Sequence, residues 1–183
     1  MKSICLTGGL LLIALAACPL FAEECPAWGE NKALLQFLRD HKSNGKAADP
    51  ACISRAFSSL GHDKTYLKAL VELLDFERNN EDDDSLRFPS SRYPAIGALD
   101  SYDAVPYLLK AIKDSDSELV RQNAFYALDL VYKDCPLTLV TVLRNEAAKP
   151  ENTVDQKARL QAAATFADEH RGTRPCRSDS SAQ

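Results

Sequence analysis

The sequence predicts an all-α protein in which antiparallel helix hairpins stack side by side. The clearest signal is the stretch 92–131, where two successive segments repeat apolar residues three or four and then seven positions apart, as on one helix face. A second signal is repetition, because Tyr66-Leu67 and Tyr107-Leu108 begin corresponding helices after corresponding helix-ending leucines. A third is that no run alternates apolar with polar residues between turn signals, as a β-strand would.

Local capping signals set the bounds of the first three helices. Residues 31–42 place their apolar side chains on one stripe, which predicts an amphipathic helix. Asp49 followed by Pro50 is an N-cap with proline at the first helical position, and this second helix is expected to stop at Gly61. Asp63 then caps a third helix, so the second and third helices are expected to form a hairpin.

The remaining helices are predicted from apolar stripes bounded by turn residues. They are a helix that ends near Leu99 and the segments 103–113, 120–131, 136–149 and 152–170. Extra residues within 77–91 form an inserted loop between two of the hairpins. Helices 31–42 and 152–170 are expected to cap a repeat domain that spans residues 31–170. Residues 171–183 have no periodicity and are expected to be largely disordered.

The helix ends of the central stretch follow a recurrent order of residues. Ala95, Ala98 and Leu99 close one helix, and Asp103-Ala104-Val105-Pro106-Tyr107-Leu108 opens the next; Asp114-Ser115-Asp116, Val120-Arg121 and Ala124-x-x-Ala127-Leu128 continue the order. It resembles the HEAT-like repeats of the phycobilisome-lyase type. The resemblance implies a short right-handed α-solenoid of the armadillo type. It also implies that the acidic turn at Asp114 caps the next helix and that Arg121 ties neighbouring turns together.

The N-terminal residues are typical of an export signal. A positively charged start is followed by the apolar run 10–17, which is too short to span a bilayer, and no later stretch reaches the roughly 20 apolar residues that spanning needs. Cleavage after Ala22 would remove residues 1–22 as a signal peptide and leave a periplasmic or secreted protein. Alternatively, Leu15-Ala16-Ala17-Cys18 resembles a bacterial lipobox. In that case residues 1–17 are removed and an acylated Cys18 anchors the chain to a membrane.

Four cysteines remain after the first of these cleavages, and in the alternative a fifth, Cys18, is acylated. An even set in an exported chain is typical of disulfides, and four cysteines allow three pairings. We expect Cys25–Cys52 and Cys135–Cys176, because each pair would tie down one end of the helical stack. No Cys-x-x-Cys occurs and no histidine has zinc-like spacing to a cysteine, so no metal or cofactor is predicted.

Residues that suggest catalysis or metal binding have simpler explanations. The acidic run 81–84 lacks the alternation and the glycine of an EF-hand loop, and a solvated loop is expected there. His41, His62 and His170 lie in different segments, and no nucleophile motif accompanies them. Because enzyme sites gather titratable groups in one pocket, we predict no catalytic residue and no enzyme activity. The formal net charge of -4 also argues against a nucleic-acid partner.

A binding surface is the remaining prediction. In a helical solenoid the second helix of each hairpin lines the concave face, and here those helices are 63–76, 103–113 and 136–144. Their outward charged residues are Lys68, Glu72, Lys110, Lys113 and Arg144. We expect an exported, non-enzymatic scaffold that binds an unidentified protein or peptide through this face. The alternatives are a lipid-anchored structural component of the envelope and, since some members of the repeat class attach or remove chromophores, a lyase-like or ligand-handling enzyme.

Overall fold

The computed structural model describes residues 25–44, 49–76 and 92–171, and within these ranges the chain is helical and contains no β-strand. The expected all-α class is therefore confirmed. The α-helices of these ranges are α1 (Asn31–Asn44), α2 (Pro50–Gly61), α3 (Leu67–Val71), α4 (Arg92–Gly97), α5 (Val105–Asp114), α6 (Glu118–Val131), α7 (Pro136–Ala147) and α8 (Val154–Arg171). Two single turns of 3₁₀-helix, η1 (Lys64–Tyr66) and η2 (Tyr102–Ala104), precede α3 and α5. The predicted leader with Cys18, the predicted loop within 77–91 and the tail from 172 lie outside the described residues.

The predicted caps Asp49 and Asp63 begin their elements where the sequence places them. The Asp49 side chain accepts a hydrogen bond from the backbone N–H of Ala51, with Pro50 at the first helical position of α2, and Asp63 accepts from the backbone N–H of Thr65 in η1. In the turn that follows Asp114, the capping residue of α6 is Ser117, which the sequence did not single out and which accepts from the backbone N–H of Val120 at 3.3 Å. These side chains satisfy N–H groups that have no partner within their own helix.

The third predicted helix is shorter than expected. The sequence suggests one helix from Asp63 to Phe76, but the chain forms η1, then α3, and leaves the α-helix after Val71. The backbone N–H groups of Leu73 and Leu74 bond to carbonyls three residues earlier, so the chain tightens into turns. This tightening buries Leu73, Leu74 and Phe76 together, whereas a continuous helix would spread them around its surface.

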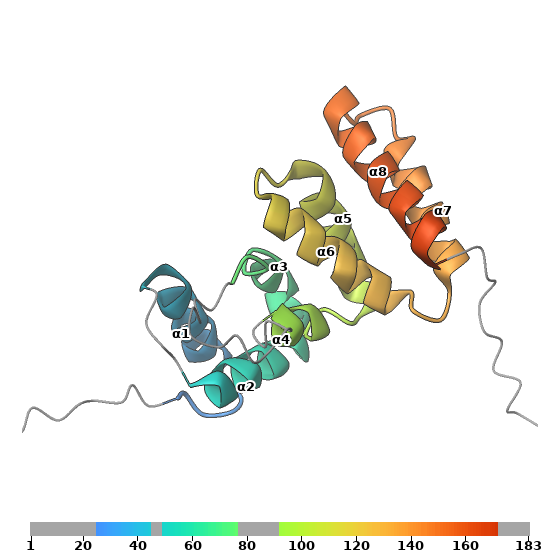
Figure 1. Cartoon of the computed structure of the whole chain (residues 1–183). Coiled ribbons are helices and arrows are strands. Elements are labelled where there is room, and N and C mark those ends of the chain that lie inside the picture. Colours follow the sequence, from blue (N-terminus) through green and yellow to red (C-terminus); the bar gives the residue numbers. More distant parts are fainter. Residues whose placement is uncertain (1–24, 45–48, 77–91, 172–183) are drawn as a thin grey trace, which may run out of the picture.

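The helices lie in pairs that progress from one end of the molecule to the other (Figure 1). α1 packs on α2, α2 on α4 and α4 on α6, while α3 packs on α5. The two most extensive contacts are the antiparallel pairs α5/α6 and α7/α8. The second helices of the hairpins were expected to lie next to one another, and α3 does contact α5. In the last hairpin, however, α8 rather than α7 makes the main contact with α5.

One core of mainly leucine side chains runs through the stack and includes fully buried Leu34, Leu60, Leu108, Leu128 and Leu143. Gly61, which was expected only to end a helix, also allows α2 and α4 to approach closely. A Cβ atom at this position would lie 2.5 Å from the carbonyl oxygen of Ala98.

A disulfide joins Cys25 to Cys52, with the Cα atoms 5.7 Å apart, and confirms the first predicted pairing. It fixes the segment before α1 against α2, where Cys52 is buried. Cys135 is also disulfide-bonded, but its predicted partner Cys176 lies outside the described residues. None of the helices in the described residues is long and apolar enough to cross a membrane.

Candidate functional site

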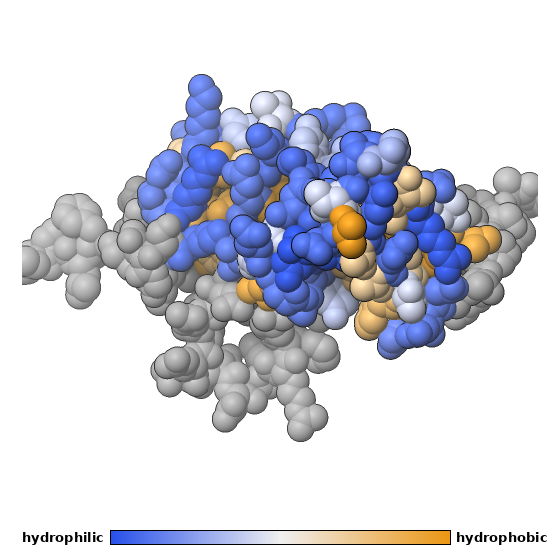
Figure 2. Space-filling view, turned by 90° about the horizontal axis from the view of Figure 1, so that it is seen from above, coloured by the Kyte–Doolittle hydropathy of each residue, from blue (hydrophilic) through white to orange (hydrophobic). Residues whose placement is uncertain are grey.

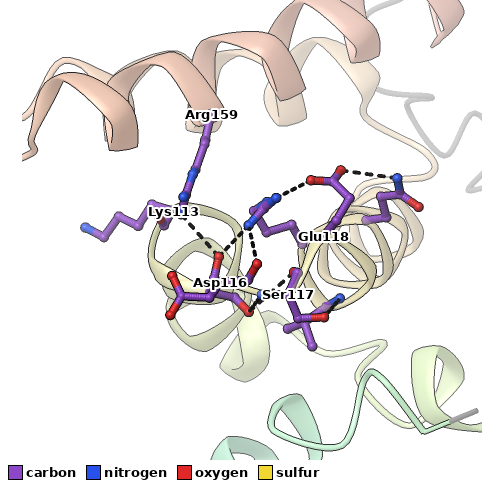
Figure 3. Close-up of polar contacts among 9 residues, drawn as sticks. Lys113, Asp116, Ser117, Glu118 and Arg159 are labelled. Atoms are coloured by element: carbon purple, nitrogen blue, oxygen red, sulfur yellow. Dashed lines mark hydrogen bonds and ion pairs between the residues drawn. The ribbon is translucent and has the colours of Figure 1, made fainter.

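Several side-chain hydrogen bonds of the C-terminal half meet at the turn between α5 and α6 (Figure 3). Arg121 Nη1 donates to the backbone oxygens of Ser115 at 2.6 Å and of Asp116 at 3.1 Å, and Nη2 pairs with the Glu118 carboxylate. The hydrogen bond from Arg121 is the main reason that the pKa of Glu118 lies below its ordinary value, and Gln122 adds to the effect. Arg121 thus satisfies carbonyls of the turn that follows α5.

The last hairpin reaches the same turn through α8. Arg159 Nη1 donates to the backbone oxygens of Lys113 at 2.9 Å and of Ser115 at 3.2 Å, and Figure 3 shows its side chain descending from α8. Gln156 Nε2 donates to Asp114 Oδ1 at 2.7 Å. Asp114 and Arg121 therefore both lie where α5, α6 and α8 meet. The sequence offers no local signal for Arg159, because its partners are distant along the chain.

Lys113 lies in a mostly buried network beside this turn. Its Nζ donates to Glu146 Oε1 at 2.8 Å and to Asn152 Oδ1 at 3.1 Å, and the Lys113 and Glu146 side chains are 17% and 10% exposed. Burial raises the pKa of Glu146, but hydrogen bonds and positive charge from Lys113 and Lys149 outweigh it and hold the pKa below its ordinary value. Lys113 was expected on a partner-binding face, and the structure instead directs it to α7 and the connection to α8.

The other residues of the expected face also make contacts within the chain. Lys110 pairs with Asp114 on its own helix at 2.9 Å, Glu72 lies 3.9 Å from an α1 arginine, and Arg144 pairs with an α8 aspartate at 2.8 Å. Lys68 is exposed. Lys110 and Lys113 line one hollow of about 550 Å³ between α5 and the α7–α8 connection, but the remaining three do not line it.

A second hollow lies between α6 and α8 and is more apolar. This groove has a volume of about 440 Å³, with Ile112 of α5 in its lining. Arg121, Arg159, Glu118 and Gln122 also line it, and its apolar residues are Phe125, Tyr126, Ala162, Ala163 and Phe166. Figure 2 shows a largely hydrophilic face on which apolar side chains emerge as strips toward the end of the molecule that holds α7 and α8.

Aromatic rings are exposed along this groove. Tyr126 and Phe166 are 48% and 43% exposed, although Phe166 meets Phe125 edge to face with the ring centroids 5.5 Å apart. His170 stacks on Phe166 at 4.0 Å. The sequence gives no local signal for this cluster of rings, because two lie on α6 and two on α8, and only the packing of α8 against α5 brings them to one groove.

The three histidines do not converge on a catalytic group. The Nδ1 atoms of His41, His62 and His170 each lie within 2.9 Å of the backbone oxygen four residues earlier in the chain. Among the described residues, no group of three or more His, Cys, Asp or Glu side chains is placed to hold a metal ion. What the described surface provides is an apolar groove flanked by guanidinium groups, an arrangement suited to non-covalent binding.

Comparison with known proteins returned no match to a family model, a curated protein or a solved structure.

Proposed function

We propose that this protein is an exported, non-enzymatic scaffold, built from HEAT-like hairpins in a short right-handed solenoid, that binds a protein or peptide. The groove between α6 and α8 carries the proposal, because Tyr126 and Phe166 expose large aromatic surface beside two arginines. Aromatic and arginine side chains are enriched at protein interfaces and supply much of their binding energy.

The groove is a better candidate than the charged face expected from the sequence. Lys113 is largely buried and its ammonium group is bonded to Glu146 and Asn152, so contact with a partner would require breaking these bonds. Lys110 remains exposed, but an exposed lysine held by an i,i+4 pair contributes little to affinity. We therefore propose that α6 and α8 form the main contact surface for the partner.

Export is supported by the Cys25–Cys52 disulfide, because such bonds persist in oxidising compartments and are rare in the cytosol of most organisms. The lipid-anchored alternative differs from free secretion in the cleavage site and in the acylation of Cys18. The intact mass of the mature protein should correspond to a chain that begins at Glu23. A mass that corresponds to an acylated chain beginning at Cys18 would establish the anchored form.

Affinity capture from the native secreted or envelope fraction tests the binding function. The full chain serves as bait beside an Ala162→Trp variant, which fills the groove from an exposed position, and an Ala33→Trp variant on α1 as the matched control. We expect a partner in a stoichiometric complex with the wild type and the control but not with the groove variant. Equal recovery of that partner by all three baits would contradict the placement of the site in the groove.

A further inference from the structure

One part of the groove between α6 and α8 is lined by charged side chains and the other part by apolar side chains. A ligand that fits both parts must itself have a charged and an apolar group. We propose that the occupant of the groove is an extended peptide segment that carries an acidic side chain three positions from an aromatic or large aliphatic side chain. The inference rests on the proposed peptide-binding function and adds the class of peptide and the spacing of its two key side chains.

One end of the groove, at Arg121 and Arg159, carries a net positive charge. Arg121 and Arg159 contribute two positive charges there and Glu118 one negative charge, which leaves a net charge of +1 among the ionised side chains that line the groove. Arg159 bonds to backbone oxygens through Nη1 alone, and within the described part of the chain neither its Nε nor its Nη2 has a hydrogen-bond partner. A guanidinium group has five N–H donors in a planar fork, so the remaining donors can bind a carboxylate.

The two arginine side chains are also preorganised. Backbone oxygens of the α5–α6 region hold both guanidinium groups in place before any ligand arrives. Side chains that are already ordered lose less conformational entropy on binding, so a carboxylate gains more from these arginines than from free surface lysines.

The apolar part of the groove can hold a large side chain. Tyr126 and Phe166 present exposed aromatic surface, Phe125 lines the groove from a buried position, and Ala162 and Ala163 leave space between the helices. A volume of about 440 Å³ lies in the range of sites that enclose side chains or small ligands. An aromatic or large aliphatic side chain would cover exposed ring surface and contact the rings edge to face or by offset stacking.

The spacing of the two parts sets the spacing in the ligand. Arg159 and Phe166 are seven residues apart on α8, which at the helical rise corresponds to about 10 Å. An extended peptide in the polyproline II conformation covers about 9 Å in three residues, and because it has three residues per turn, side chains three positions apart lie on the same side. A carboxylate at the arginines therefore places a side chain three positions away beside Phe166.

Selection of random ten-residue peptides displayed on phage, against the immobilised full-length oxidised protein, tests this inference. We expect the enriched peptides to share an Asp or Glu three positions from a Phe, Tyr, Trp or Leu. For a synthetic enriched peptide, replacing the acid with its amide should raise the dissociation constant about tenfold, since a charge-assisted hydrogen bond is lost. Ala162→Trp should weaken binding by a similar factor, and Ala33→Trp should leave it unchanged.

Each contrary result has a distinct meaning. Enriched peptides without an acid, or an amide version that binds as tightly as the acid, would overturn the ligand class. Peptides that bind Ala162→Trp as tightly as the wild type would overturn the site but leave a peptide-binding function standing. A selection that enriches no peptide would overturn the inference, whereas the proposed function is overturned only if affinity capture also recovers no partner. The amide comparison alters only the peptide, so it remains decisive if the tryptophan variant does not fold.

Discussion

Replacing Lys113 with methionine is expected to destabilise the fold by about 2 kcal/mol, because Lys113 holds α5 to the last hairpin. Methionine keeps an unbranched apolar stem of similar length and removes only the ammonium group. The change eliminates two hydrogen bonds, to Glu146 at 2.8 Å and to Asn152 at 3.1 Å. It also leaves the mostly buried carboxylate of Glu146 with one positive charge fewer beside it.

The magnitude follows from the type and number of these contacts. A hydrogen bond to a charged group contributes about 1.5–3 kcal/mol net, and removing one partner of a fully buried ion pair costs about 3–5 kcal/mol. Glu146 retains Lys149, whose Nζ lies 2.6 Å from Oε2, so the loss should fall toward the lower end of these ranges. An exposed i,i+4 pair such as that of Lys110 contributes only about 0.3–0.5 kcal/mol.

Urea unfolding followed by circular dichroism measures the difference in free energy of unfolding. Lys110→Met is the matched control, since it removes an ammonium group from the same helix at an exposed position. If Lys113→Met is no more destabilising than Lys110→Met, the network has no stabilising role and Lys113 returns to being a candidate contact residue.

The pH dependence of this difference provides a second check. The pKa of Glu146 is lower in the folded protein than its ordinary value, which approximates the unfolded chain. The pair therefore contributes its full stability above the unfolded pKa, and this contribution is lost as the pH falls through the folded pKa. We expect the gap between wild type and Lys113→Met to narrow in acid. A gap that stays constant down to pH 2 would show that the carboxylate is not the partner.

Four further variants test the packing. Gly61→Ala should cost at least about 2 kcal/mol, because its Cβ would overlap the backbone of Ala98 just after α4, whereas Gly97→Ala meets no atom within 4 Å and should change the melting temperature little. Replacing Cys25 and Cys52 together with serine should cost about 3.5 kcal/mol for a loop with a sequence separation of 27, and an unchanged urea midpoint would refute this estimate. Asn123→Ala should cost about 1–3 kcal/mol in urea unfolding, since it leaves a buried backbone oxygen after α3 unsatisfied; a loss below 0.5 kcal/mol would contradict that bond.

The helix bounds were predictable where a short segment of sequence determines them. Asp49 with Pro50 begins α2, and Asp63 begins η1, because each cap depends only on the next few N–H groups. The end of α3 was not predictable in this way. Its apolar stripe continues to Leu74, but the core accommodates Leu73 and Phe76 as well, and this tertiary demand ends the helix early.

The site was harder to predict than the fold, since its residues meet only through the docking of helices. Lys113 is a charged residue on an amphipathic helix and suggests a solvent-facing position. Lys113 is instead mostly buried and connects α5 to α7, because Glu146, far along the chain, lies beside its ammonium group. Phe166 similarly suggests an ordinary core position, but the placement of α8 against α5 leaves this ring partly exposed in a groove.

The central claim is that the partner binds in the groove between α6 and α8. Chemical-shift mapping with a selected peptide tests it most directly, because one experiment compares the groove with the charged face expected from the sequence. Two-dimensional amide spectra of the full-length, oxidised protein would be recorded during titration with a peptide from the phage selection. If the peptide binds in the groove, the largest shifts should fall in residues 118–126 and 159–166. Largest shifts in residues 63–76 and 103–113, with little change in α8, would contradict the account and assign binding to the charged face.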